Sequence, residues 1–118
     1  MVMEEVELVR AACCVAGVDG EVTERERAVL QRLAERAGIG AASLKAMMDL
    51  AKTDEHFRDD QLEMVHADPA KSFETLYRVA RIEREVPREE CDLLIRFGHK
   101  LGLDLDAMNG VIKRVHGE

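Results

Sequence analysis

With 118 residues, the chain has room for one domain with a modest hydrophobic core, but not for two ordinary domains. Its 24 acidic residues outnumber the 17 basic ones, and the net charge of −7 argues against binding to nucleic acid or to anionic membranes. Aromatic residues make up only 3% of the chain, so aliphatic residues, methionine and alanine must fill the core. This composition is typical of helices packed on helices.

Neither the apolar runs nor the cysteines indicate a membrane-inserted or secreted protein. No apolar run reaches the roughly 18 residues that a membrane-spanning helix needs, and the N-terminal sequence MVMEEVELVR is acidic where a signal peptide is basic. The three cysteines form no CxxC pair and no disulfide framework, which fits a reducing compartment. We therefore expect a cytoplasmic protein.

Apolar residues spaced three and four positions apart predict three helices in the first part of the chain. The first covers about residues 3–18 and carries one apolar stripe. Thr23 and Glu26 match the S/T-x-x-E pattern of a capping box, so a second helix begins directly after Thr23. Gly38 supplies the left-handed residue that ends it. A third helix covers about residues 41–52.

The second part of the chain is also predicted to be helical throughout. Asp68 followed by Pro69 is a helix start signal, and Asp104 is placed to cap the last helix. No segment alternates with a period of two for long enough to predict a strand. We predict a short helix within residues 53–68 and longer helices over about residues 69–83, 87–101 and 105–116.

The chain repeats itself with an offset of 64 residues. Under this shift roughly forty residues align with about eight identities, where about three are expected by chance. The repeats cover about residues 9–51 and 73–115. The sequence therefore predicts an all-α, single-domain bundle over 1–118, with about seven helices and an internal pseudo-twofold repeat. Matched pairs include Glu21/Glu85, Val22/Val86, Glu26/Glu90, Leu30/Leu94 and Gly38/Gly102.

Two matched stretches of this repeat are rich in acids. The first acidic segment is VDGEVTERE, residues 18–26, and the second is IEREVPREE, residues 82–90. A D/E-G-E-V/I turn, a capped helix containing Glu, and a following Gly-Ile or Gly-Leu resemble the TerB-like tellurite-resistance family. The resemblance covers nearly the whole chain. It departs at Arg84, which stands where the first segment has Gly20.

The resemblance implies a helical bundle of about seven helices with a role in a metal-sensing or metal-associated membrane stress complex, and hence a protein partner. If the pseudo-twofold axis brings the segments together, four carboxylates could bind a hard divalent cation. Calcium, magnesium or manganese would suit such ligands better than zinc. The predicted metal ligands are Asp19, Glu26, Glu83 and Glu90.

The first acidic segment alone is at best a partial EF-hand. With Gly20 at the sixth loop position, Asp19 and Glu26 fall at ligand positions, but the first and third positions are Val15 and Gly17. A metal-free reading also fits these residues. Glutamates in the first turn of a helix are stabilised by the helix dipole by about 0.3 to 1 kcal/mol, and Asp-Gly is a common turn.

Other candidate metal-binding residues form less specific patterns. Glu63 and His66 form one ExxH half-motif of di-iron bundles, but no second copy exists. Cys13 and Cys14 could form a soft-metal thiol pair, although packing in the core is the simpler interpretation, and Cys91 is also expected to pack. The chain has no zinc-protease, nucleophile-elbow or phosphate-loop motif.

Three functional hypotheses follow. The first is a non-enzymatic module that binds a divalent cation through its acidic segments and docks on a protein partner, in tellurite or stress response as the resemblance implies. The second is a metal-free acidic domain that recognises a basic partner. The third is a carboxylate-bridged di-iron protein.

Overall fold

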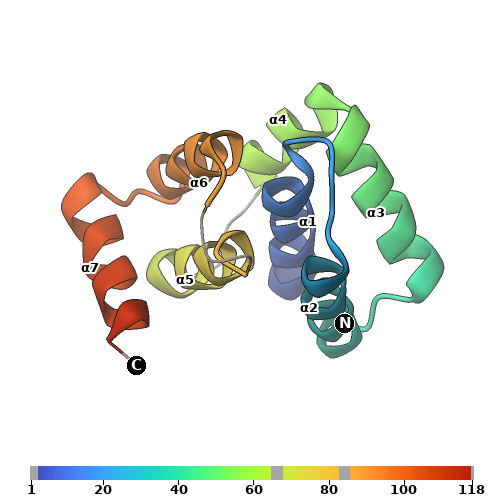
Figure 1. The fold of residues 1–118 in the computed structure, drawn as a ribbon, viewed down its shortest axis with the longest axis horizontal. Coiled ribbons are helices and arrows are strands. Elements are labelled where there is room, and N and C mark those ends of the chain that lie inside the picture. Colours follow the sequence, from blue (N-terminus) through green and yellow to red (C-terminus); the bar gives the residue numbers. More distant parts are fainter. Residues whose placement is uncertain (1–2, 65–67, 83–85, 118) are drawn as a thin grey trace.

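The described part of the chain folds into seven α-helices and contains no β-strand (Figure 1). The structure is a computed structural model that describes residues 3–64, 68–82 and 86–117. The predicted all-α class and the number of helices are confirmed. The helices are α1 (Met3–Gly17), α2 (Glu24–Ala37), α3 (Ala41–Thr53), α4 (Glu55–Met64), α5 (Pro69–Ala80), α6 (Arg88–Lys100) and α7 (Leu105–His116).

Local signals set several helix ends where the sequence predicts them. Asp68 caps α5 by accepting a hydrogen bond from the amide of Lys71 at 3.0 Å. Asp104 caps α7 in the same way, through the amide of Ala107 at 2.8 Å. Gly38 ends α2 with a φ of +78°, a left-handed conformation that glycine adopts without steric cost. α5 stops at Ala80, a few residues before its predicted end.

The backbone repeats with the sequence. α6 and α7 begin 64 residues after α2 and α3, so the first half (α1–α3) and the second half (α5–α7) have matching elements. Gly38 and Gly102 both have positive φ angles, +78° and +88°. In both halves the amide of the next residue donates to the carbonyl five positions back, at 2.8 and 2.9 Å. The two interhelix turns therefore share one backbone design.

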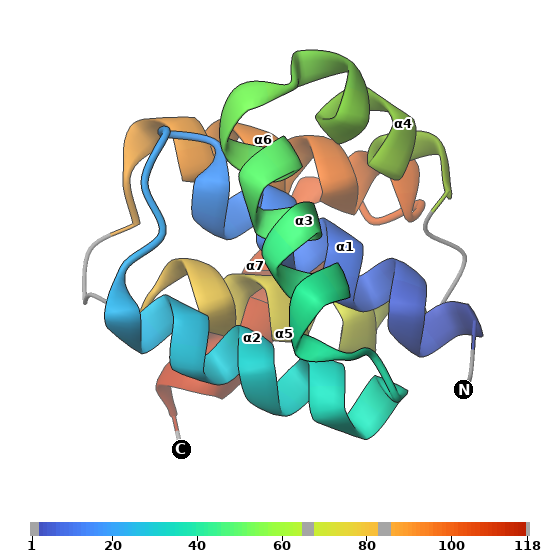
Figure 2. The same cartoon turned by 90° about the vertical axis from the view of Figure 1, so that its right-hand side faces the viewer.

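α1 lies at the centre of the bundle, against α2, α3, α4, α5 and α6 (Figure 1 and Figure 2). Residues 11–16 of α1 are all fully buried. The single apolar stripe predicted for this helix is therefore wrong in extent: a helix surrounded on all sides must be apolar on all sides.

α5 packs against fewer helices, namely α1, α6 and α7. Within the described residues, no helix covers it as α4 covers α1. One side of α5 accordingly carries charged residues, where Arg78 pairs with Glu74 at 3.5 Å. Arg114 of α7 also pairs with Glu74.

α4 is the short helix expected in the acidic stretch, and it joins the two halves. It packs on α1 and α3 of the first half and on α6 of the second half. Arg58 donates to the carbonyl of Ala51 at the end of α3 at 2.7 Å, and Asp59 pairs with Arg96 of α6 at 3.2 Å. In the part of the chain that the structure describes, no helix combines the length and the apolar character needed to cross a bilayer.

Candidate functional site

The first acidic segment is an ordered turn held by its own backbone. The amide of Gly20 donates to the carbonyl of Gly17 at 2.9 Å, and Gly20 has a φ of +89°. The Asp19 carboxylate accepts from the amide of Glu21 at 3.1 Å and is exposed to solvent. The turn thus holds the Asp19 side chain at the surface, directly before the start of α2.

The capping box predicted at the start of α2 is confirmed. The amide of Thr23 donates to Glu26 Oε1 at 2.9 Å, and the amide of Glu26 donates to Thr23 Oγ1 at 3.2 Å. Glu26 is only 4% exposed, which is unusual for a glutamate in the first turn of a helix. The cap allows this burial, because it supplies a hydrogen-bond donor to the carboxylate.

The second acidic segment places Glu90 in the same position of α6, with a different result. Glu90 is 3% exposed, and its Oε1 atom is buried without a hydrogen bond from any described residue. Pro87 occupies the N-cap position and makes no side-chain cap. A buried carboxylate oxygen without a donor is rare in native proteins, because it has lost its water and gained nothing in return.

Electrostatics show that the two acidic segments are neighbours. The pKa of Glu90 is raised from its ordinary value of 4.5 to about 8, first by burial and then by the nearby charges of Glu26, Asp19 and Glu89, in that order. Both ribbon views agree, since the loop between α1 and α2 lies beside the start of α6 (Figure 1 and Figure 2). The fold therefore brings acids from both halves to one place.

Of the four predicted metal ligands, Asp19 and Glu26 lie near enough to Glu90 for their charges to raise its pKa. Glu83, the fourth, lies outside the described residues, as does Arg84. Among the residues that are described, no group of three or more His, Cys, Asp or Glu side chains is arranged to hold a metal ion. Two chemical outcomes suit such a cluster: it can bind a hard cation, or it can keep a proton at neutral pH.

The sequence interpretation missed the difference between Glu26 and Glu90. It treated them as equivalent ligands because they match in the repeat. The available signal was Pro87, which stands where the first segment has Thr23. Proline has no amide hydrogen, so a capping box cannot form there.

The cysteines divide into two environments. Cys13 and Cys14 are fully buried in α1, and burial raises the pKa of Cys13 to about 12 and that of Cys14 further still. Neither is a thiolate at neutral pH, so both act as small apolar core residues. The expectation that Cys91 packs in the core is wrong, because it is exposed on the outer side of α6.

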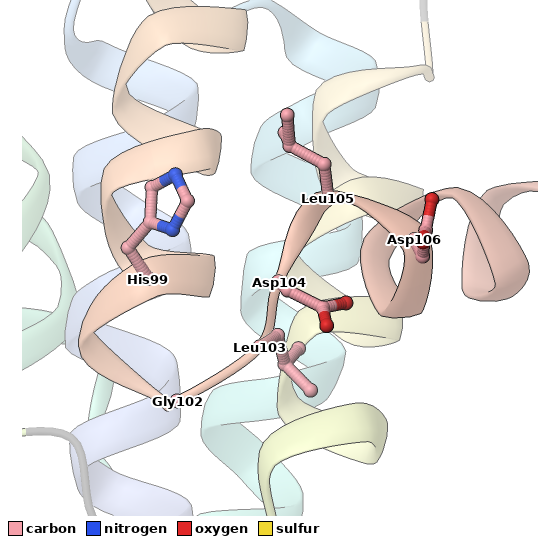
Figure 3. Close-up of a pocket in the computed structure, with 6 residues that line it drawn as sticks. All are labelled: His99, Gly102, Leu103, Asp104, Leu105 and Asp106. Carbon is pink, nitrogen blue, oxygen red and sulfur yellow. The ribbon is translucent and has the colours of Figure 1, made fainter.

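Two further candidates lie elsewhere in the chain. Of the Glu63–His66 half-motif, His66 and the side chain of Glu63 lie outside the described residues. An open hollow of about 550 Å³ lies at the turn between α6 and α7 (Figure 3). Its Asp104 already caps α7, and its Leu105 is 59% exposed. The hollow is lined by His99, Gly102, Leu103, Asp104, Leu105 and Asp106.

The fold and the site define an all-α protein with an internal repeat and two adjoining acidic segments. Comparison with known proteins adds no relative to this description: no family model, no curated protein and no solved structure matches the chain.

Proposed function

We propose that this protein is a non-enzymatic, TerB-like helical module that binds a divalent cation between its two acidic segments and docks on a protein partner. The observation that carries the proposal is the buried Oε1 of Glu90, which accepts no hydrogen bond from a described residue and lies beside Asp19 and Glu26. A cation would supply the positive charge that this oxygen lacks and would offset the repulsion among the three carboxylates.

The ligand chemistry favours a hard, oxygen-preferring ion. Asp19, Glu26 and Glu90 offer carboxylate oxygens only, and Glu83 is the proposed fourth ligand. Calcium takes six to eight oxygen ligands, and magnesium keeps several of its waters, so either ion could complete its shell with water or backbone carbonyls. Manganese has similar preferences, and zinc is the least suited of these metals.

The proposal is tested by thermal unfolding of the chelator-treated protein with calcium, magnesium or manganese added in turn. An ion present at about a hundred times its dissociation constant adds roughly 2.7 kcal/mol to the free energy of unfolding, and the melting temperature rises on the order of 10 °C. Sodium chloride at matched ionic strength controls for simple screening. The measured quantity is the response to the ion, not the starting melting temperature.

Matched variants separate a specific site from general acidity. Glu90→Gln and Asp19→Asn each remove one proposed ligand charge with little change in shape, and we expect either to abolish most of the response. Glu89→Gln removes the same charge from the exposed neighbouring position and should keep the response. If the wild-type protein shows no shift with any of the three ions, the cation proposal is wrong.

A metal-free interaction domain is the second candidate function. It is favoured by the finding that the described residues contain no ready three-ligand cluster. In that case the net charge of −7 provides the recognition surface, and the partner is a basic protein. The same titration distinguishes the two functions, because only the first predicts stabilisation by divalent ions. A role in tellurite or stress response completes the proposal on the strength of the family resemblance, together with a cytoplasmic location inferred from the acidic N-terminal sequence and the cysteine pattern.

A further inference from the structure

Thr23 and Pro87 hold the same place in two otherwise matching helix starts. Their φ and ψ angles, −71° and 164° for Thr23 and −57° and 151° for Pro87, are both extended. The amide four residues on donates to the carbonyl of each cap residue at 2.9 Å. Glu26 and Glu90 then follow three residues after the cap, 4% and 3% exposed. The backbone therefore presents both glutamates in the same way.

The chemistry of the two cap residues is opposite. Thr23 offers an amide hydrogen to Glu26 Oε1, and its hydroxyl accepts from the Glu26 amide. Pro87 has neither an amide hydrogen nor a hydroxyl group. The Glu90 carboxylate is therefore brought to the same buried position without the donor that satisfies Glu26.

We propose that Pro87 is a positioning residue that keeps Oε1 of Glu90 available as a ligand, by removing the donor that would otherwise hold it in a capping box. This inference rests on the proposed cation-binding function. Glu26 already uses Oε1 for its own cap, so the repeat becomes functionally asymmetric. Glu90 is the principal ligand, and Glu26 supports the site from a fixed position.

The test is Pro87→Thr, which rebuilds the first half's cap in the second half. Without divalent ions, in excess chelator, we expect the melting temperature to rise by about 5 °C, because the buried oxygen gains a donor and α6 gains a cap. With the ion that stabilises the wild-type protein, we expect the apparent dissociation constant to rise about tenfold, because Oε1 is now occupied. A purely structural role for Pro87 predicts no change in affinity.

Two controls accompany this variant. Pro87→Ala supplies the amide hydrogen without the hydroxyl, so its effects on melting and on affinity should fall between those of wild type and Pro87→Thr. Asp104→Ala removes the N-cap of α7, away from the start of α6, so it should lower the melting temperature and leave the ion affinity within twofold of wild type.

The outcomes separate this inference from the function on which it rests. If wild type responds to the ion and Pro87→Thr binds it equally well, the role of Pro87 is refuted and the cation site stands. If wild type does not respond at all, the cation site and the role of Pro87 are both refuted. A lower melting temperature for Pro87→Thr in chelator also overturns the inference, because the rebuilt cap would then not satisfy Glu90.

Discussion

α1 and α5 occupy matching places in the two halves, yet their surroundings differ. α1 is enclosed by five helices, and Cys14 on it is fully buried. α5 contacts three helices, and its counterpart position holds Arg78, whose side chain is 42% exposed. Both positions lie on the same backbone framework, so the difference follows from α4, which covers only the first. The comparison shows that a repeated backbone can carry opposite side-chain chemistry where burial differs.

The two acidic segments differ in hydrogen bonding and not in burial. There the burial is the same, since Glu26 and Glu90 are almost equally inaccessible, but the hydrogen bonding differs. A single cap residue, Thr23 or Pro87, decides whether the buried carboxylate is satisfied. The first half satisfies its buried carboxylate through the cap, whereas the second half leaves one buried oxygen of Glu90 without a donor from the described residues.

The largest expected effect comes from placing the residue type of α5 at the matching position of α1. Cys14→Arg places a charge in the enclosed helix, near Arg58, and should remove more than about 4 kcal/mol from the free energy of unfolding. Since a domain of this size holds about 5 to 15 kcal/mol, we expect little folded protein. Arg78→Ala on α5 should change stability by less than about 1 kcal/mol. Urea unfolding followed by circular dichroism measures both, and a stably folded Cys14→Arg variant would refute the enclosure of α1.

A smaller, pH-dependent effect is expected at Glu90. Because its pKa is raised to about 8 in the folded protein, the folded state keeps a proton that the unfolded state releases above pH 4.5. The stability of wild type relative to Glu90→Gln is therefore greatest below pH 4.5, falls as the pH rises to about 8, and is constant above that. The slope within this window is at most about 1.4 kcal/mol per pH unit.

Denaturant unfolding in chelator at several pH values measures this difference. Glu89→Gln is the control, because it removes an exposed charge that contributes least to the raised pKa of Glu90, so it should keep most of the pH dependence of wild type. A difference between wild type and Glu90→Gln that stays constant from pH 4.5 to 8 would contradict the buried, unsatisfied state of this carboxylate.

The smallest effect tests the packing of α6 against α7. A Cβ atom added at Gly98 would overlap the side chain of Met108, which is itself buried. Overpacking costs about 1 to 3 kcal/mol, and the better helix propensity of alanine returns up to about 1 kcal/mol. We expect Gly98→Ala to lose about 1 kcal/mol in urea unfolding. The first half has Ala34 and Leu44 at these positions, so adding Met108→Leu should restore most of the loss. A Gly98→Ala protein more stable than wild type would contradict this account.

Much of the fold was predictable because its signals are local. Asp68 and Asp104 cap the helices they precede, and Gly38 ends α2 in a left-handed conformation. Each of these signals acts within one turn of helix, so neighbouring residues suffice to predict it. The repeat was also visible in the sequence, since matched helix starts require matched residues.

Some features that the sequence interpretation missed also have local signals in the sequence. The run AACCVA in α1 has no polar residue on any side, which indicates a helix surrounded by others. Pro87 three residues before Glu90 excludes a capping box by covalent structure alone. Cys91 is different: it lies three residues before the buried Leu94, so helical spacing alone places it too close to the apolar side.

Short-range chemistry was enough to decide where the helices begin and end, because hydrogen bonds to the first and last turns involve residues only a few positions apart. Which surfaces lose water depended on the assembled bundle. α4 encloses α1 and leaves α5 partly open, and the packing of α6 buries Glu90 beside acids from a segment 64 residues away. Desolvation and charge repulsion depend on distances in space, so the raised pKa of Glu90 exists only in the folded protein.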